Sequence, residues 1–110
     1  MLNPDYVRAL ITHVNNSPFP QFLPFEIADV SIDEATVTMM VNENHYQPLR
    51  TVHGGIIATL IDTATFWAAF ANVPEDDGMV SVDLKLNYLK PALSGLLTAK
   101  SRCIRGGRTL

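Results

Sequence analysis

The stretch from Gly54 to Ala71 limits the possible folds more than any other part of the chain. Its side chains are almost all Ile, Leu, Ala, Phe, Trp or Thr, and Asp62 carries the only formal charge. A helix that is apolar on every face must be buried on every face. In a chain of 110 residues, an antiparallel sheet that curls around the helix can bury it. The sequence therefore predicts an α+β fold in which four or more strands wrap around one central helix.

An amphipathic helix is predicted over residues 4–15. Asn3 and Pro4 are typical of a helix N-terminus, and apolar side chains then recur at helical spacing. An irregular connector is expected next, because prolines interrupt the pattern at positions 18, 20 and 24. This connector holds three aromatic side chains that are too apolar for a solvated loop and are expected to line a surface or cavity: Phe19, Phe22 and Phe25.

Alternating apolar and polar side chains predict strands in the rest of the chain. The first two are expected to form a hairpin with its turn at Asp33-Glu34, followed by a loop over residues 42–52. Another turn is expected at residues 74–78. The predicted strands are residues 25–32, 35–41, 80–88 and 96–105, of which 80–88 alternates most regularly.

The length indicates one domain over residues 1–110, and the charge argues against some classes of binding partner. The formal net charge is −3 and the basic residues are scattered, which disfavours general binding to nucleic acid or acidic membranes. No signal-peptide pattern and no apolar run long enough to span a membrane is visible. The single cysteine, Cys103, fits a reducing compartment, so a cytoplasmic protein is expected.

The carboxylate of Asp62 needs an explanation, because burial disfavours its charged form. It could bond Thr59, Thr63 or the backbone and only specify packing, or it could be functional. The glycines Gly54 and Gly55 at the helix start favour the second alternative. The first N–H groups of a helix have no partners within it and can hold an oxyanion, and glycine lets a substrate approach closely.

Helix geometry places the glycines at the helix start far from the Asp62 carboxylate. Gly54 and Asp62 are eight residues apart, which is about 12 Å along a helix. One carbonyl group cannot contact both, because an oxyanion donor must lie about 3 Å away. Two antiparallel helices from two subunits would bring Gly54 of one chain to Asp62 of the other. The sequence thus predicts a homodimer with sites shared between chains. A dimer of dimers is the expected further assembly, although helix geometry leaves dimer and tetramer open.

These residues resemble the hotdog-fold acyl-CoA thioesterases, in particular the PaaI-like type of phenylacetate degradation. The similarity extends over about residues 20–110 and is carried by three segments: His53 to Asp62, Val80 to Leu84, and Asn87 to Ala92. It implies an acyl-CoA substrate and no cofactor. The roles that it implies are the nucleophile or general base for Asp62, the polarising N–H for Gly54, orientation of the carbonyl or water for Gln47, and a hydroxyl near the attacking water for Ser81.

The resemblance assigns His53 to anchoring the loop rather than to general-base chemistry, and His53 and Gly55 are expected to lie against the substrate. His13 and His45 show no partner pattern, and no set of residues has metal-ligand spacing. Candidate cations for the CoA phosphates are Lys90, Arg102, Arg105 and Arg108, although solvated charge at a strand edge explains them as well. Candidate side chains for an acyl pocket are Phe19, Phe22, Phe66 and Trp67, although core packing explains them equally.

One departure from the family pattern lies at the C-terminus. Members of the family usually continue with two more strands after a segment like 105–110, so the sequence is expected to lack the last strands of the fold. Two other functions stay open. One is a non-catalytic module that binds acyl-CoA or mediates dimerisation. The other, a hydratase of the same fold, is disfavoured because its paired Asp and His signature is not evident.

Overall fold

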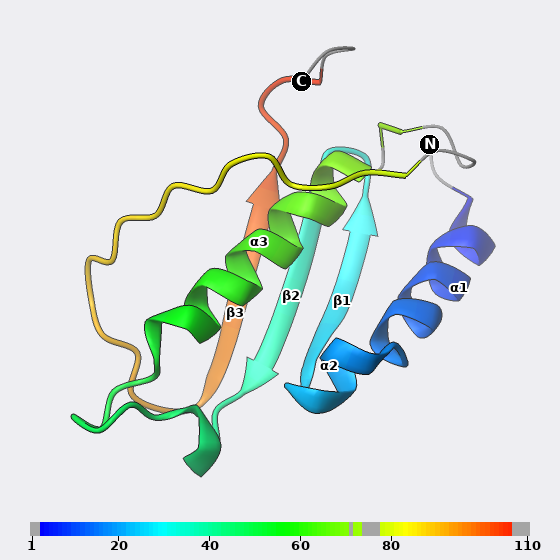
Figure 1. Cartoon of the computed structure of the whole chain (residues 1–110). Helices are drawn as coiled ribbons and strands as arrows, with labels where there is room; N and C mark the ends of the chain where they lie inside the picture. The colour runs from blue at the N-terminus through cyan, green and yellow to red at the C-terminus, as the bar shows by residue number, and fades with distance from the viewer. Residues whose placement is uncertain (1–2, 71, 74–77, 107–110) are drawn as a thin grey trace.

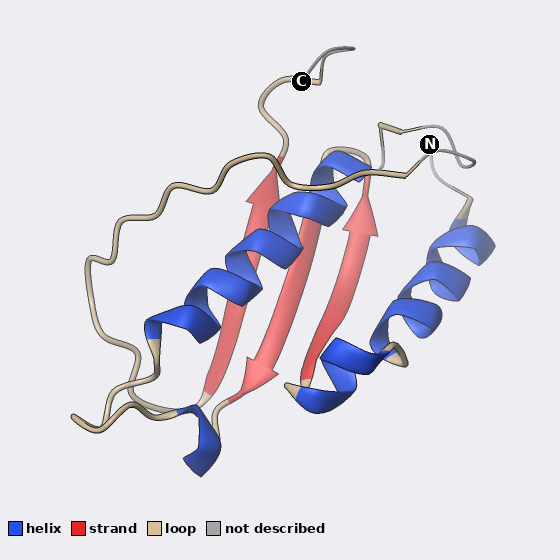
Figure 2. Ribbon diagram, viewed as in Figure 1, coloured by secondary structure: helices blue, strands red, loops and turns tan. Residues whose placement is uncertain are grey.

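The computed structural model describes residues 3–70, 72–73 and 78–106. In chain order its elements are α1 (Pro4–Asn15), α2 (Pro18–Phe22), β1 (Phe25–Ser31), β2 (Glu34–Met40), the 3-10 helix η1 (Glu43–His45), α3 (Gly54–Phe70) and β3 (Leu96–Arg102). The described strands form one antiparallel sheet in the order β1-β2-β3. Helix α3 crosses one face of this sheet, and α1 runs beside β1 (Figure 1; Figure 2).

The core lies between α3 and the sheet. Val37, in the middle of the central strand, is 0% exposed and pairs with Ile27 of β1 and Ala99 of β3. Helix α3 contributes Leu60, Ala64 and Ala68, which are spaced four residues apart and therefore form one stripe along the helix. These contacts fix the direction in which α3 crosses the sheet.

Helix α3 is fully buried only along this stripe. Ile56, Ile61 and Trp67 are half-buried, and Thr65 is exposed. The expectation of burial on every face is therefore not met within one chain, because the three described strands cover a single face of the helix. None of the helices in the described part of the chain is long and apolar enough to cross a membrane.

The N-terminal segment confirms one prediction and corrects another. Helix α1 spans the predicted residues, and the Asn3 side chain caps it by accepting a hydrogen bond from the Asp5 N–H at 2.8 Å. The predicted irregular connector contains the short helix α2, because Pro18 stands at its first position, where an N–H is not needed. Of the connector phenylalanines, Phe25 is in the core, whereas Phe22 is 85% exposed and lines nothing in the described chain.

The predicted hairpin is confirmed, but its turn lies one residue earlier, at Ile32-Asp33. Asp33 has a φ of 64°, in the left-handed region that Asp tolerates better than most residues. Its carbonyl accepts a hydrogen bond from the Cys103 N–H at 2.6 Å, and its side chain accepts one from Asn72 at 2.5 Å. The turn is thus tied to the chain beyond α3 and beyond β3.

The prediction of a strand over residues 80–88 is wrong for the described structure. This segment is extended but joins no sheet, and it runs over α3 on the side away from the strands (Figure 1, yellow). Val80 and Val82 are both 81% exposed. Alternation of apolar and polar residues indicates which side chains lie on the same face of an extended segment. It does not specify another strand with which the backbone can form hydrogen bonds. The last predicted strand is confirmed as β3, which ends at Arg102, three residues earlier than expected.

We expect the Leu60→Ala substitution to lower the free energy of unfolding by about 3 kcal/mol, because it opens a cavity between α3 and β2. The matched control on the same helix is Thr65→Ala, at an exposed position, which should change it by less than about 0.5 kcal/mol. Urea unfolding followed by circular dichroism measures both. Equal losses for the two variants would contradict the described packing of α3.

Candidate active site

Of the four backbone N–H groups at the start of α3, three have acceptors, and the fourth has none among the described residues. The first four N–H groups of a helix have no partners inside it. Here the N–H of His53 donates to the carbonyl of His45 at 2.8 Å, and the N–H of Ile56 donates to the carbonyl of His53 at 3.0 Å. The N–H of Gly55 donates to Nδ1 of His53 at 2.8 Å. Among the described residues nothing accepts from Gly54, so of these four its N–H is the one available to a ligand.

The side chain of His53 caps α3, and Gly55 makes this possible. A Cβ atom at Gly55 would lie 2.9 Å from Nδ1 of His53, which is too close. Since Nδ1 accepts a hydrogen bond, it carries no proton, and the Nε2 atom of the exposed ring is left for other contacts. This arrangement agrees with an anchoring function for His53.

The loop before α3 is closed by its own hydrogen bonds. Tyr46 and Val52 form an isolated antiparallel bridge, and the N–H of Val52 donates to the carbonyl of Ala92 at 2.9 Å. Both ends of the Gln47 side chain bond inside the loop: Nε2 donates to Oγ1 of Thr51 at 2.6 Å, and Oε1 accepts from the Leu49 N–H at 3.0 Å. In this state the Gln47 amide shapes the turn.

Arg50 contacts two other residues of this region, Tyr46 and Glu43. It adopts a φ of 67°, its guanidinium lies 4.5 Å from the centre of the Tyr46 ring, and Nη2 donates to Glu43 at 3.1 Å. The hydrogen bond and the charge of Glu43 raise the pKa of the Arg50 guanidinium. Arg50 is therefore engaged within the loop.

The structure brings together two of the predicted catalytic residues, Asp62 and Ser81. Oγ of Ser81 donates a hydrogen bond to Oδ1 of Asp62 at 2.9 Å. The carboxylate is half-buried, and its described side-chain partner is Ser81 rather than Thr59 or Thr63. Thr59 instead donates to the carbonyl of Gly55 at 2.9 Å. The extended segment 78–89 thus places the Ser81 hydroxyl against the Asp62 carboxylate.

Tyr88 belongs to the same segment, and the sequence predicts no function for it. Its hydroxyl donates to the carbonyl of Gly54 at 3.1 Å, and its ring lies 3.4 Å from where a Gly54 Cβ would stand. The segment therefore contacts α3 beside both Gly54 and Asp62. Alternation in the sequence marks Tyr88 as one side chain of a strand, and it carries no signal for this contact.

The predicted cations fall into two places. Lys90 is two residues from Ala92, whose carbonyl binds Val52, and so it belongs to the end of the molecule that holds Gly54. Arg102 pairs with Glu34 at the other end of β3, next to Ser101, whose Oγ donates to the carbonyl of Ala64 at 2.6 Å. Arg105 follows β3, and Arg108 lies outside the described residues. Among the described cations, Lys90 and Arg102 thus lie at different ends of one chain.

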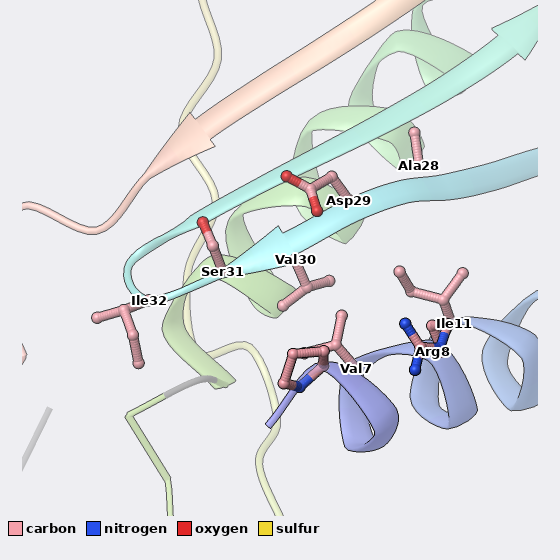
Figure 3. Close-up of a pocket in the computed structure, with 9 residues that line it drawn as sticks. Val7, Arg8, Ile11, Ala28, Asp29, Val30, Ser31 and Ile32 are labelled. Atoms are coloured by element: carbon pink, nitrogen blue, oxygen red, sulfur yellow. The ribbon is translucent and has the colours of Figure 1, made fainter. Parts of the chain in front are cut away.

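One hollow lies away from these residues. It has a volume of about 710 Å³ and runs between α1 and β1, where Val7 and Ile11 face Val30 (Figure 3). No residue of α3 lines it, so we do not assign it to the site. A smaller hollow of about 220 Å³ lies between α3 and β3 and is largely apolar. Its lining residues are Ile57, Leu60, Ile61, Ala92, Leu97, Thr98 and Ala99.

The candidate aromatic pocket is divided between two clusters. Phe19 packs edge-on against Phe25 with ring centres 5.4 Å apart. Phe66 and Trp67 contact each other at 5.0 Å, and both contact Phe70 on the same helix. Within the described ranges, no three His, Cys, Asp or Glu side chains are grouped so that they could hold a metal ion.

Comparison with known proteins decides the family. The family model described as the thioesterase superfamily matches residues 49–110, more than half of the chain and all of the candidate site from His53 onward. The chain belongs to the thioesterase superfamily. Among curated thioesterase relatives, it is 36% identical over 73 residues to acyl-coenzyme A thioesterase 13 of Mus musculus, covering 66% of this chain and 51% of that protein. It is 29% identical over 84 residues to 1,4-dihydroxy-2-naphthoyl-CoA hydrolase of Listeria monocytogenes, covering 76% and 68%.

Solved thioesterase structures share the fold. A thioesterase of Haemophilus influenzae matches with a TM-score of 0.81 at 28% identity, over 93% of this chain and 71% of that one. The PaaI protein of the E. coli phenylacetic acid degradation operon matches with a TM-score of 0.75 at 25% identity, over 91% and 72%. The expected hotdog fold and PaaI-like family are confirmed. The chain spans about half to two thirds of the length of the two curated relatives named above.

We expect His53→Ala to lower the free energy of unfolding by about 1 kcal/mol, because the Gly55 N–H loses its acceptor. His53→Asn, which offers another side-chain acceptor, should recover most of this loss. His13→Ala, at an exposed position of α1, is the control and should change stability by less than about 0.5 kcal/mol. Urea unfolding measures all three variants, and equal stability of the His53→Ala and His53→Asn proteins would rule out the cap.

Proposed function

We propose that this chain hydrolyses small or medium acyl-CoA thioesters to the free acid and CoA. The single observation that carries the proposal is the N–H of Gly54, which has no acceptor in the described part of the chain, whereas the other three of the first four N–H groups of α3 are occupied. An amide held at the positive end of a helix can stabilise the oxyanion that forms when a thioester carbonyl is attacked. The names of the Mus musculus and Listeria monocytogenes relatives support CoA thioesters as substrates.

In the proposed reaction Asp62 activates the attack. As a general base, it takes a proton from water while the water oxygen bonds to the carbonyl carbon; as a nucleophile, its own oxygen forms that bond, and water later releases the acid. In either case the carbon–sulfur bond breaks when the oxyanion collapses, and CoA leaves as the thiolate. The hydroxyl of Ser81, 2.9 Å from Oδ1 of Asp62, orients the carboxylate or the attacking water.

Two chains are needed to complete the site. Eight residues separate Gly54 from Asp62 within α3, which is about 12 Å along the helix axis. A two-fold axis that sets two α3 helices side by side and antiparallel would pair Gly54 of each chain with Asp62 of the other. The half-buried apolar side chains of α3 support such a contact, because one chain leaves them incompletely covered. We propose a homodimer, further paired as a dimer of dimers.

The same arrangement accounts for the two groups of cations. Lys90 would accompany Gly54 from one subunit, while Arg102 would come from the other, since it follows Ser101, which contacts Ala64 near Asp62. Arg105, which follows β3, would extend this second group, and Arg108 stays a further candidate for phosphate binding. Guanidinium groups bind phosphates with two parallel hydrogen bonds and therefore suit the phosphates of CoA.

The remaining assignments follow from the same residues. The apolar hollow of about 220 Å³ between α3 and β3 is the proposed place for a small acyl group, because it adjoins the helical turns between Gly54 and Asp62. Gln47, His53 and Gly55 are proposed to border the thioester. We place the enzyme in the cytoplasm, in agreement with its single cysteine.

Asp62→Asn keeps the shape of the side chain and an acceptor for Ser81 but removes the base. We expect kcat for acyl-CoA hydrolysis to fall about 10³-fold, and Ser81→Ala to lower it about tenfold. Ser94→Ala, a surface serine with no described hydrogen bond, is the matched control and should retain full turnover. A panel of acyl chain lengths, assayed by release of the CoA thiol, measures these values.

Unchanged turnover in the Asp62→Asn enzyme would exclude the mechanism. Acyl-CoA binding by the wild-type chain without thiol release, for every chain length tested, would instead identify a non-catalytic acyl-CoA-binding module.

A further inference from the structure

His45 is the buried polar side chain of the described core. It is 1% exposed, ends the 3-10 helix η1, and lies eight residues before His53. Burial of an imidazole is unfavourable unless its polar atoms find partners. The position of His45 therefore requires an explanation beyond filling space.

Three hydrogen bonds hold His45 in place. Its Nδ1 accepts from the N–H of Asn42 at 2.9 Å, and its own N–H donates to the carbonyl of Asn42 at 3.0 Å. Its carbonyl accepts from the N–H of His53 at 2.8 Å. The imidazole thus takes the place that Glu or Gln usually occupies in a capping box, the third position of a short helix.

The third of these bonds reaches the proposed oxyanion donor. The N–H of His53 and the N–H of Gly54 belong to consecutive peptide groups, so the bond to His45 restricts the backbone of His53 and with it the direction of the Gly54 N–H. An oxyanion donor is effective only when it is aimed correctly before the reaction. From this geometry we infer that His45 is a positioning residue for the Gly54 amide, an inference that rests on the proposed function.

The side chain of His45 is needed to hold its carbonyl toward His53. If Nδ1 is removed, the Asn42 N–H loses its acceptor, η1 loses its cap, and the His45 carbonyl is no longer held toward His53. His45 itself makes no hydrogen bond to Gly54 or Asp62 in the described structure, so its influence passes through the loop. The expected signature is a loss of kcat with little change in KM.

The test compares three variants of the full-length chain. His45→Leu removes the acceptor, and kcat should fall about 30-fold while KM stays within about threefold. His45→Gln restores the usual capping-box side chain and should recover kcat to within about fivefold of wild type. Asn44→Ala is the matched control, because the Asn44 side chain lies exposed in the same short helix and makes no described hydrogen bond, and kcat should be unchanged.

A second readout does not depend on catalysis. In ¹H–¹⁵N spectra, the Gly54 amide resonance should shift in the His45→Leu protein and stay near its wild-type position in the His45→Gln and Asn44→Ala proteins. An unshifted Gly54 amide in folded His45→Leu protein would overturn the inference. So would equal kcat losses in the His45→Leu and His45→Gln enzymes. If the wild-type chain hydrolyses no acyl-CoA, the proposed function fails. The shift of the Gly54 amide resonance still tests whether His45 orients that amide.

Discussion

The contact between α3 and the central strand β2 determines where every candidate residue lies. Leu60, Ala64 and Ala68 hold one stripe of the helix against the sheet. Because this stripe fixes the rotation of the helix about its axis, it also determines where Gly54 and Asp62 point. Small residues at positions 64 and 68 allow the helix to lie close to the strands. The packing that stabilises the chain is thus also what orients its chemistry.

A second constraint is the satisfaction of backbone N–H groups where α3 begins. Most helices satisfy these groups with water or with one capping side chain. Here the His45 carbonyl, the His53 ring and the His53 carbonyl take three of the first four groups, and among these the Gly54 N–H is left without an acceptor in the described chain. A single donor without an acceptor in the described chain, held between hydrogen-bonded neighbours, differs from an unbonded glycine-rich turn. It has one direction, which is what oxyanion stabilisation requires.

Local signals in the sequence predicted much of this structure. Asn3 and Pro4 marked the start of α1, alternation gave the hairpin, and the apolar run gave α3. The segment 80–88 shows where local information ends, since alternation does not specify a backbone partner. The same limit applies to the site. The residue types at Asp62 and Gly54 suggested chemistry, whereas the partner of the carboxylate, the contact of Tyr88 and the burial of His45 depend on tertiary structure.

The central claim is that Gly54 of one chain and Asp62 of another form one site, and mixed dimers test it directly. Gly54→Pro removes the free N–H at the first position of α3, where proline is well tolerated, and Asp62→Asn removes the base. Each variant alone should be inactive. Co-expression in equal amounts should give about a quarter of wild-type turnover, since half of the dimers then contain one intact site. Co-expressed dimers as inactive as either parent would contradict a site shared between chains.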